Sequence, residues 1–154
     1  MTTNIYPKYI ERAPRRTGKT TRLIRALKDF RGMVYYNAPV IIISPNPHMS
    51  QSLKESFLST LTHFTANREG WVREERVHNN DPSRDILFAS IQWLRGRGEV
   101  RDAYFFFDEL EDIPFRIDQW VLKRTVYVNY TPRGTDTSNL TELIYLNGGL
   151  RNVY

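Results

Sequence analysis

The chain contains no cysteine, and this absence excludes two ways of building a small protein. Disulfide-bonded scaffolds and zinc sites made of thiolates both require that residue. With 154 residues, of which 40% are hydrophobic and 13% aromatic, the chain can instead bury a core of ordinary size. We therefore expect one folded domain that spans residues 1–154.

Long apolar runs are also missing. No stretch approaches the roughly 20 apolar residues that a membrane-spanning helix needs, and the polar start, Met1 to Asn4, lacks the core of a signal peptide. The histidines have no spacing typical of metal ligands, and no serine has a histidine and an acid in a suggestive arrangement. We expect a cytoplasmic protein with no membrane partner.

What the sequence does contain is a basic segment, Ala-Pro-Arg-Arg-Thr-Gly-Lys-Thr, from Ala13 to Thr20. Its spacing is that of a phosphate-binding loop, with alanine at the position usually held by the first glycine. In such a loop backbone N–H groups face the phosphates of a nucleotide, Gly18 allows close approach, and Lys19 reaches the β- and γ-phosphates. The hydroxyl of Thr20 would bind magnesium. The candidate nucleotide-binding residues are Ala13, Pro14, Arg15, Arg16, Thr17, Gly18, Lys19, Thr20 and Thr21.

A second element of matching chemistry follows later in the chain, where the apolar run Ala103 to Phe107 ends in Asp108 and Glu109. The run is rich in β-forming residues and has the form of a Walker B strand buried on both faces. Asp108 is expected to hold magnesium through its water shell, and Glu109 to orient the attacking water. Alone, the run fits a core strand ending in a solvated acidic loop equally well. The phosphate-binding loop in the same chain favours the nucleotide site.

Apolar periodicity predicts strands that alternate with helices. A helix is expected from Thr20 to Phe30, and a second from near Ser50 or Ser52, which forms a capping box with Glu55, to about His63. The predicted strands cover 40–43, 85–90, 103–107, 125–130 and 142–146, with short candidates at 71–72 and 76–77. Such alternation predicts a three-layer α/β/α fold with a mainly parallel central sheet and its ligand at the carboxyl ends of the strands.

The segment before the loop is a poor buried strand. Pro7 cannot donate to a sheet ladder and Lys8 interrupts the apolar run, so a strand here is expected to be short or to start late.

The net charge of +5 is concentrated near the amino terminus. Between Lys8 and Arg31 the sequence carries nine basic residues against two acidic ones, an excess larger than that of the whole chain. Such an excess predicts a polyanion near this segment. The alternative is a solvated helix face combined with nucleotide contacts.

Taken in order, these motifs resemble the ATPase domain of the large terminase subunit. Terminases are motors that package DNA into the capsids of tailed viruses, and they are P-loop NTPases of the ASCE class related to superfamily-two helicases. The resemblance covers about Ile10 to Leu146. Its most specific elements are Arg15 to Thr20, Leu94-Arg95-Gly96, Asp108-Glu109 and Thr131-Pro132-Arg133-Gly134.

The resemblance implies a magnesium-dependent ATPase that couples hydrolysis to movement along double-stranded DNA. It implies that Lys19 and Thr20 bind phosphate and magnesium, that Asp108 holds the ion, and that Glu109 is the catalytic carboxylate. Thr131 would sense the γ-phosphate and transmit hydrolysis to the DNA. An arginine would stabilise charge in the transition state, in cis or from a neighbouring subunit, and the eligible ones are Arg15, Arg16, Arg95, Arg97 and Arg133.

The resemblance also implies partners: a homo-oligomeric ring, and a portal protein or a separate nuclease, since the chain has no room for a nuclease domain. Two other functions fit the same motifs. The chain could use ATP as a conformational switch beside a helicase or packaging partner, because it lacks a second lobe to close over the nucleotide. It could also be a small-molecule kinase, although Asp108-Glu109 and Thr131-Pro132 at the ends of strands argue against this.

Overall fold

The structure is a computed structural model that describes residues 9–14, 18–32, 39–61, 64–66, 71–74, 85–95, 102–132 and 138–146. Within these ranges the strands form one seven-stranded sheet in the order β1-β7-β6-β2-β5-β4-β3. Their bounds are β1 Tyr9–Arg12, β2 Val40–Ser44, β3 Phe64–Ala66, β4 Trp71–Glu74, β5 Ile86–Ser90, β6 Tyr104–Phe107 and β7 Thr125–Tyr130. The helices are α1 Lys19–Gly32, α2 Pro47–Thr60, α3 Ile91–Leu94, α4 Gln119–Lys123 and α5 Ser138–Leu146, with a 3-10 turn, η4, at Leu110–Asp112.

Five neighbouring strands, β1, β7, β6, β2 and β5, are parallel to one another. Strands β4 and β3 extend the sheet beyond β5 in antiparallel pairings. The mainly parallel sheet predicted from the sequence is therefore confirmed. Parallel strands buried on both faces read as continuous apolar runs, and β2 is such a strand, with every residue from Val40 to Ser44 buried.

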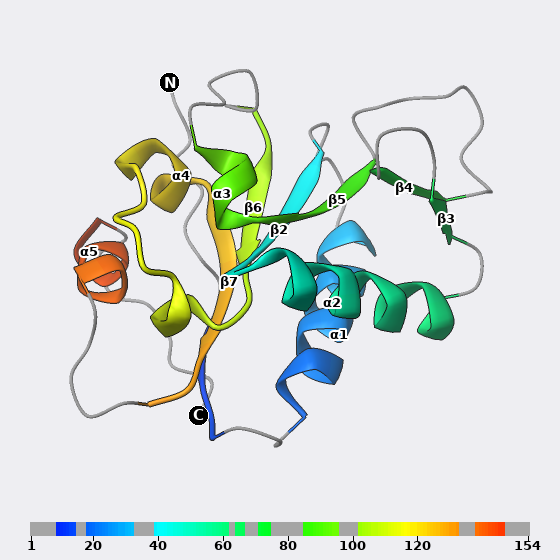
Figure 1. Cartoon of the computed structure of the whole chain (residues 1–154), viewed down its shortest axis with the longest axis horizontal. Coiled ribbons are helices and arrows are strands. Elements are labelled where there is room, and N and C mark those ends of the chain that lie inside the picture. Colours follow the sequence, from blue (N-terminus) through cyan, green and yellow to red (C-terminus); the bar gives the residue numbers. More distant parts are fainter. Residues whose placement is uncertain are drawn as a thin grey trace.

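Helices cover both faces of the sheet (Figure 1). On one face, Leu23 and Leu27 of α1 and Phe57 of α2 pack into a single core with Ile42 and Phe106 of the sheet. On the other face, Leu110 of η4, Leu122 of α4 and Leu143 of α5 pack against the opposite side of the same strands. Ile43 of β2 and Phe107 of β6 belong to this second core. Neighbouring residues of one strand thus face different cores, which is the alternation expected of a central sheet.

Two predicted elements are wrong. The strand predicted at 142–146 is the second half of helix α5, where Asn139, Leu140 and Leu143 are buried at helical spacing while Ile144 and Tyr145 are exposed. Helix α2 begins at Pro47 and not near Ser50 or Ser52. Its cap is Asn46, whose side chain accepts a hydrogen bond from the backbone N–H of Met49 at 2.9 Å, and a proline at the first helical position favours the same start.

The remaining predictions differ by less. Strand β1 begins at Tyr9, as a late-starting strand should, and β7 has the predicted bounds. The candidate at 71–72 is β4, while β3, which was not predicted, pairs with it. The candidate at 76–77 lies outside the described residues.

Candidate functional site

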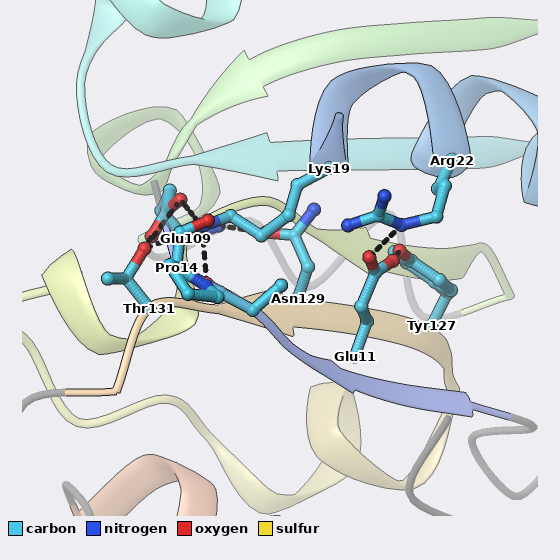
Figure 2. Close-up of polar contacts among 9 residues, drawn as sticks. Glu11, Pro14, Lys19, Arg22, Glu109, Tyr127, Asn129 and Thr131 are labelled. Atoms are coloured by element: carbon cyan, nitrogen blue, oxygen red, sulfur yellow. Dashed lines mark hydrogen bonds and ion pairs between the residues drawn. The ribbon is translucent and has the colours of Figure 1, made fainter. Parts of the chain in front are cut away.

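The carboxyl edge of the sheet brings together segments that are far apart in the sequence. Because β1, β7 and β6 are adjacent and parallel, the residues that follow these strands lie together at the carboxyl edge of the sheet. Ala13 and Pro14 follow β1, Thr131 follows β7, and Glu109 follows β6. Helix α1 starts at the same edge and contributes Lys19 (Figure 2).

The ammonium group of Lys19 is the centre of this cluster. Its Nζ donates hydrogen bonds to the backbone oxygens of Ala13 at 2.8 Å and Pro14 at 3.2 Å, and to Thr131 Oγ1 at 2.6 Å. The same atom lies 2.9 Å from Glu109 Oε1. The side chain is buried, with 6% exposed. An ammonium group has three protons to share among these four oxygens, so the site holds more acceptors than Lys19 can satisfy.

Thr131 links the lysine to the acid. Its hydroxyl accepts from Lys19 and donates to the Glu109 carboxylate, whose oxygens lie at 2.9 and 3.1 Å. The three side chains therefore form a closed triangle of hydrogen bonds and an ion pair. The Thr131 hydroxyl is therefore bonded to both charged groups at once.

The backbone of Glu109 is left-handed, with φ 52° and ψ 58°, and it is the only residue other than glycine with positive φ among those that the structure describes. A left-handed conformation costs a side-chain-bearing residue roughly 1–2 kcal/mol. The surroundings must hold it in place. The side chain of Asn129 in β7 does so, because its Oδ1 accepts the hydrogen bond of the Glu109 N–H at 2.8 Å.

Asn129 was not among the predicted site residues. The signal was present, because an amide in the otherwise apolar strand Thr125–Tyr130 is unexpected in a strand buried on both faces. Asn129 is fully buried there.

Asp108 lies directly before Glu109 and is also buried. Its backbone N–H donates to the backbone oxygen of Ile43 at 2.9 Å, which continues the pairing of β6 with β2. Burial raises the pKa of Asp108 from 3.8 to about 6; the Asn129 side chain opposes this rise, and the neighbouring Glu109 adds to it. The ionised carboxylate is therefore costly, even though the charge of Lys19 lowers its pKa.

A magnesium ion fits the donor set at Asp108 only if waters and substrate phosphates supply most of its ligands. The described residues contain no group of three or more histidines, cysteines or acids that could hold a metal. Magnesium, however, usually keeps several waters and binds through one or two carboxylates together with substrate phosphates. Asp108 and the exposed Thr20 at the start of α1 are compatible with such a site.

A second buried polar cluster holds α1 on the sheet. Glu11 of β1 is 1% exposed. It forms an ion pair with Arg22 of α1 and accepts a hydrogen bond from the hydroxyl of Tyr127 in β7. Burial raises the pKa of Tyr127 well above its ordinary value, and Glu11 adds to the rise, so the phenol keeps its proton and remains a donor. This cluster, which we call the Glu11 cluster, consists of Glu11, Arg22 and Tyr127 (Figure 2).

The same arginine explains the position of Gly18. Gly18 has φ +83°, a conformation that favours glycine, and a Cβ there would lie 3.2 Å from Nη1 of Arg22. A side chain at this position would therefore be strained by the backbone conformation and would crowd the end of the Arg22 side chain.

Among the sequence-predicted site residues, Ala13, Pro14, Lys19, Glu109 and Thr131 meet in one cluster, and Asp108 adjoins it. Gly18, Thr20 and Thr21 lie at the start of α1 beside them. Arg15, Arg16 and Thr17 lie outside the described residues, as do Arg97 and Arg133. Arg95 is described, and its guanidinium lies over the ring of Phe115 at 4.4 Å. Phe115 packs on the face of the sheet that α4 and α5 cover, so Arg95 lies on the side opposite to α1.

The described cations of the basic amino-terminal segment fall into two groups, those exposed to solvent and those paired with acids. Arg12, Arg25 and Lys28 are exposed, whereas Lys19 and Arg22 are engaged with buried acids. The exposed cations are the ones available to a polyanion.

No protein-family model matches the chain, and the comparison with curated proteins finds no match. No helix in the described ranges has the length and apolar character needed to cross a membrane.

Proposed function

We propose that this protein is a magnesium-dependent ATPase with a P-loop NTPase fold. The observation that carries the proposal is the meeting of Lys19, Glu109 and Thr131 at the carboxyl edge of a parallel sheet, within hydrogen-bonding distance of one another. Ligands of open α/β sheets bind at this edge. The residues come from three separate motifs: Lys19 from the phosphate-binding loop, Glu109 from the end of the acidic strand, and Thr131 from the motif that the terminase resemblance implies.

The chemistry of ATP binding follows from the partners of Lys19. The phosphate oxygens would replace the carbonyl oxygens of Ala13 and Pro14 and the carboxylate of Glu109 as acceptors of its protons. The start of α1 adds unpaired backbone N–H groups and the positive end of a helix dipole. Gly18 lets the chain approach the phosphates closely.

Release of Lys19 has a consequence for Glu109. Once the ammonium group turns to the phosphates, the carboxylate is free to accept a hydrogen bond from water and to orient that water for attack. Thr131, which contacts both groups, is placed to respond to this change. Asp108 would hold the magnesium ion, which supplies charge neutralisation at the phosphates.

We further propose that the ATPase acts on double-stranded DNA as an oligomeric ring, like the terminase motors that the sequence resembles. The exposed cations of the first helix, Arg25 and Lys28, support a polyanionic partner. In such a motor one of the five arginines named above would stabilise charge in the transition state.

The test is ATP hydrolysis by the purified chain with magnesium, measured with and without double-stranded DNA over a range of protein concentrations. Turnover that rises steeply with concentration or with DNA is expected for a motor assembled from several copies. Tight ATP binding without turnover in any condition would contradict the ATPase and favour the nucleotide-dependent switch. Turnover that depends on an added phosphoryl acceptor would instead identify a kinase.

A further inference from the structure

A row of polar residues crosses the sheet at its carboxyl edge. Strand pairing aligns Ser90 with Ser44 and Asn129 with Glu11. Between them, the pairs Ile43–Phe107 and Phe107–Val128 place Asp108 in line with Ser44 and Asn129 one residue further on. Each member is buried. We call this set, Ser90, Ser44, Asp108, Asn129 and Glu11, the polar row.

The row lies on the face that α1 and α2 cover. Two residues earlier on each of the central strands stand Ile42, Phe106 and Tyr127, all of which belong to the core on that face. Since side chains alternate along a strand, Ser44 and Asn129 share that face. Asp108 belongs with them, because it follows Phe106 by two residues and its backbone N–H continues the pairing of β6 with β2. This face of the sheet is thus apolar at Ile42, Phe106 and Tyr127 and polar two residues later, at the carboxyl ends of the strands.

Two groups in the row have no hydrogen-bond partner in the part of the chain that the structure describes. They are the hydroxyl Oγ of Ser44 and the amide Nδ2 of Asn129, and both atoms are fully buried. Leaving a buried polar group unpaired costs about 1–3 kcal/mol, and nearly all such groups in folded proteins are satisfied. These two stand on either side of Asp108.

We propose that Ser44 and Asn129 complete a divalent-cation site at Asp108, as hydrogen-bonding groups on either side of its carboxylate. An amide Nδ2 can only donate, so its acceptor would be an oxygen of the carboxylate or of a phosphate bound with the cation. A serine hydroxyl can donate or accept and therefore fits a cation-bound water. The ligand is a hydrated divalent cation bound together with nucleotide phosphates, so the inference depends on the proposed ATPase function.

Asn129 has a second task in this arrangement, as a positioning residue. While Nδ2 faces the cation side, its Oδ1 holds the backbone N–H of Glu109 at 2.8 Å. The Asn129 side chain therefore contacts both the proposed cation site and the backbone of Glu109, the proposed catalytic carboxylate. Hydrogen-bonding groups of this kind around a metal typically change affinity or activity by roughly 10–100-fold when they are removed.

The experiment measures ATP affinity calorimetrically for the full chain, once with Mg²⁺ and once with EDTA, and takes the ratio as the magnesium-dependent gain. Ser44→Ala should lose about tenfold of that gain and keep its affinity in EDTA. Its apo melting temperature should stay the same or rise, because an unpaired buried hydroxyl has been removed. Asn129→Ala should lose the gain as well, together with turnover.

Thr125→Val is the matched control, since Thr125 is buried at the opposite end of β7 and its hydroxyl is already bonded to the backbone oxygen of Val121 at 2.9 Å. It should lower the melting temperature and leave the magnesium-dependent gain intact. A wild-type gain that persists in both Ser44→Ala and Asn129→Ala would overturn the cation-site inference and leave the ATPase proposal standing. Absence of any gain in the wild-type chain would overturn both.

Discussion

Lys19 and Glu109 form a buried ion pair of 2.9 Å between the first residue of α1 and the second residue after β6. The pair joins the cation proposed to bind phosphate to the carboxylate proposed to orient water. In this conformation, the Lys19 ammonium and the Glu109 carboxylate are therefore bound to each other and not to a ligand. Under the proposed function, nucleotide binding would have to break this pair, and the competition between carboxylate and phosphate can be measured.

Replacement of Glu109 by glutamine should make ATP bind more tightly while abolishing hydrolysis. Glutamine keeps the shape of the side chain but no longer competes with phosphate for the charge of Lys19. We expect a gain in affinity of about tenfold, which corresponds to about 1.4 kcal/mol, measured by calorimetric titration. Glu55→Gln on the outer face of α2 serves as the control and should change neither quantity. Turnover at the wild-type rate in Glu109→Gln would remove the catalytic role from this residue.

Thr131 should tolerate serine and not valine. The hydroxyl accepts from Lys19 and donates to Glu109, and serine can make both hydrogen bonds. Valine leaves the two charged groups without their bridge, so we expect kcat to fall by about 100-fold, comparable to the removal of one general acid–base group, with a smaller change in KM. Steady-state kinetics of Thr131→Val and Thr131→Ser test this. Equal rates in the two variants would show that the hydroxyl is not used.

Asp108→Asn should stabilise the apo protein at neutral pH. Burial raises the pKa of Asp108 from 3.8 in the unfolded chain to about 6 in the fold, so the folded state binds the proton more tightly. The stability contributed by protonation is fully present below pH 3.8 and is lost as the pH rises through about 6. At pH 7.5 the ionised side chain therefore costs about 2–3 kcal/mol, at roughly 1.4 kcal/mol for each unit of pKa, and asparagine avoids this cost.

Thermal unfolding of the wild-type chain and Asp108→Asn between pH 5 and pH 8, without magnesium, measures the effect. The variant should be the more stable of the two at pH 7.5, and the difference should shrink toward pH 5. A difference that is constant over this range would mean that Asp108 does not titrate as its burial implies.

Tyr127→Phe should destabilise the fold without removing the nucleotide ligands. The hydroxyl of Tyr127 donates to Glu11, which also pairs with Arg22, and its loss leaves a buried carboxylate oxygen unsatisfied. We expect about 1–3 kcal/mol of destabilisation in urea unfolding. Tyr104→Phe is the matched control, because Tyr104 is only partly buried and its ring lies beneath the guanidinium of Arg124, a contact that phenylalanine keeps. Comparable losses in the two variants would contradict a special role for the Glu11 cluster.

Much of this fold could be predicted because its central strands are simple. Val40 to Ile43 and Tyr104 to Phe107 are apolar throughout, as strands buried on two faces must be, and the structure contains them as β2 and β6. Residues 142–146 have the composition of a strand, but the burial of Leu140 and Leu143 shows the helical period only when the segment is read from Ser138. Helix α2 was placed too late because two start signals compete, and Asn46-Pro47 prevails over Ser52-Glu55.

The candidate site was predictable where a motif carries the chemistry and not where the fold does. Lys19, Asp108 and Glu109 follow from local sequence patterns. For Asn129 the local pattern holds only an amide in a buried strand, and for Glu11 it holds no signal; the roles of both depend on the alignment of β7 with β1 and on burial. The pairing of Lys19 with Glu109 in the absence of nucleotide likewise depends on strand order, which places β7 between β1 and β6.

Nucleotide binding at Lys19 is tested most simply by calorimetric titration of MgATP into the wild-type chain, Lys19→Ala and Lys28→Ala. Lys28 is an exposed lysine of the same helix and reports on nonspecific charge effects. We expect saturable one-site binding to the wild-type chain, a loss of about 100-fold or more in Lys19→Ala, equivalent to about 2.7 kcal/mol, and an unchanged affinity in Lys28→Ala. Equal affinities in all three proteins, or no binding to the wild-type chain, would contradict a nucleotide site at Lys19.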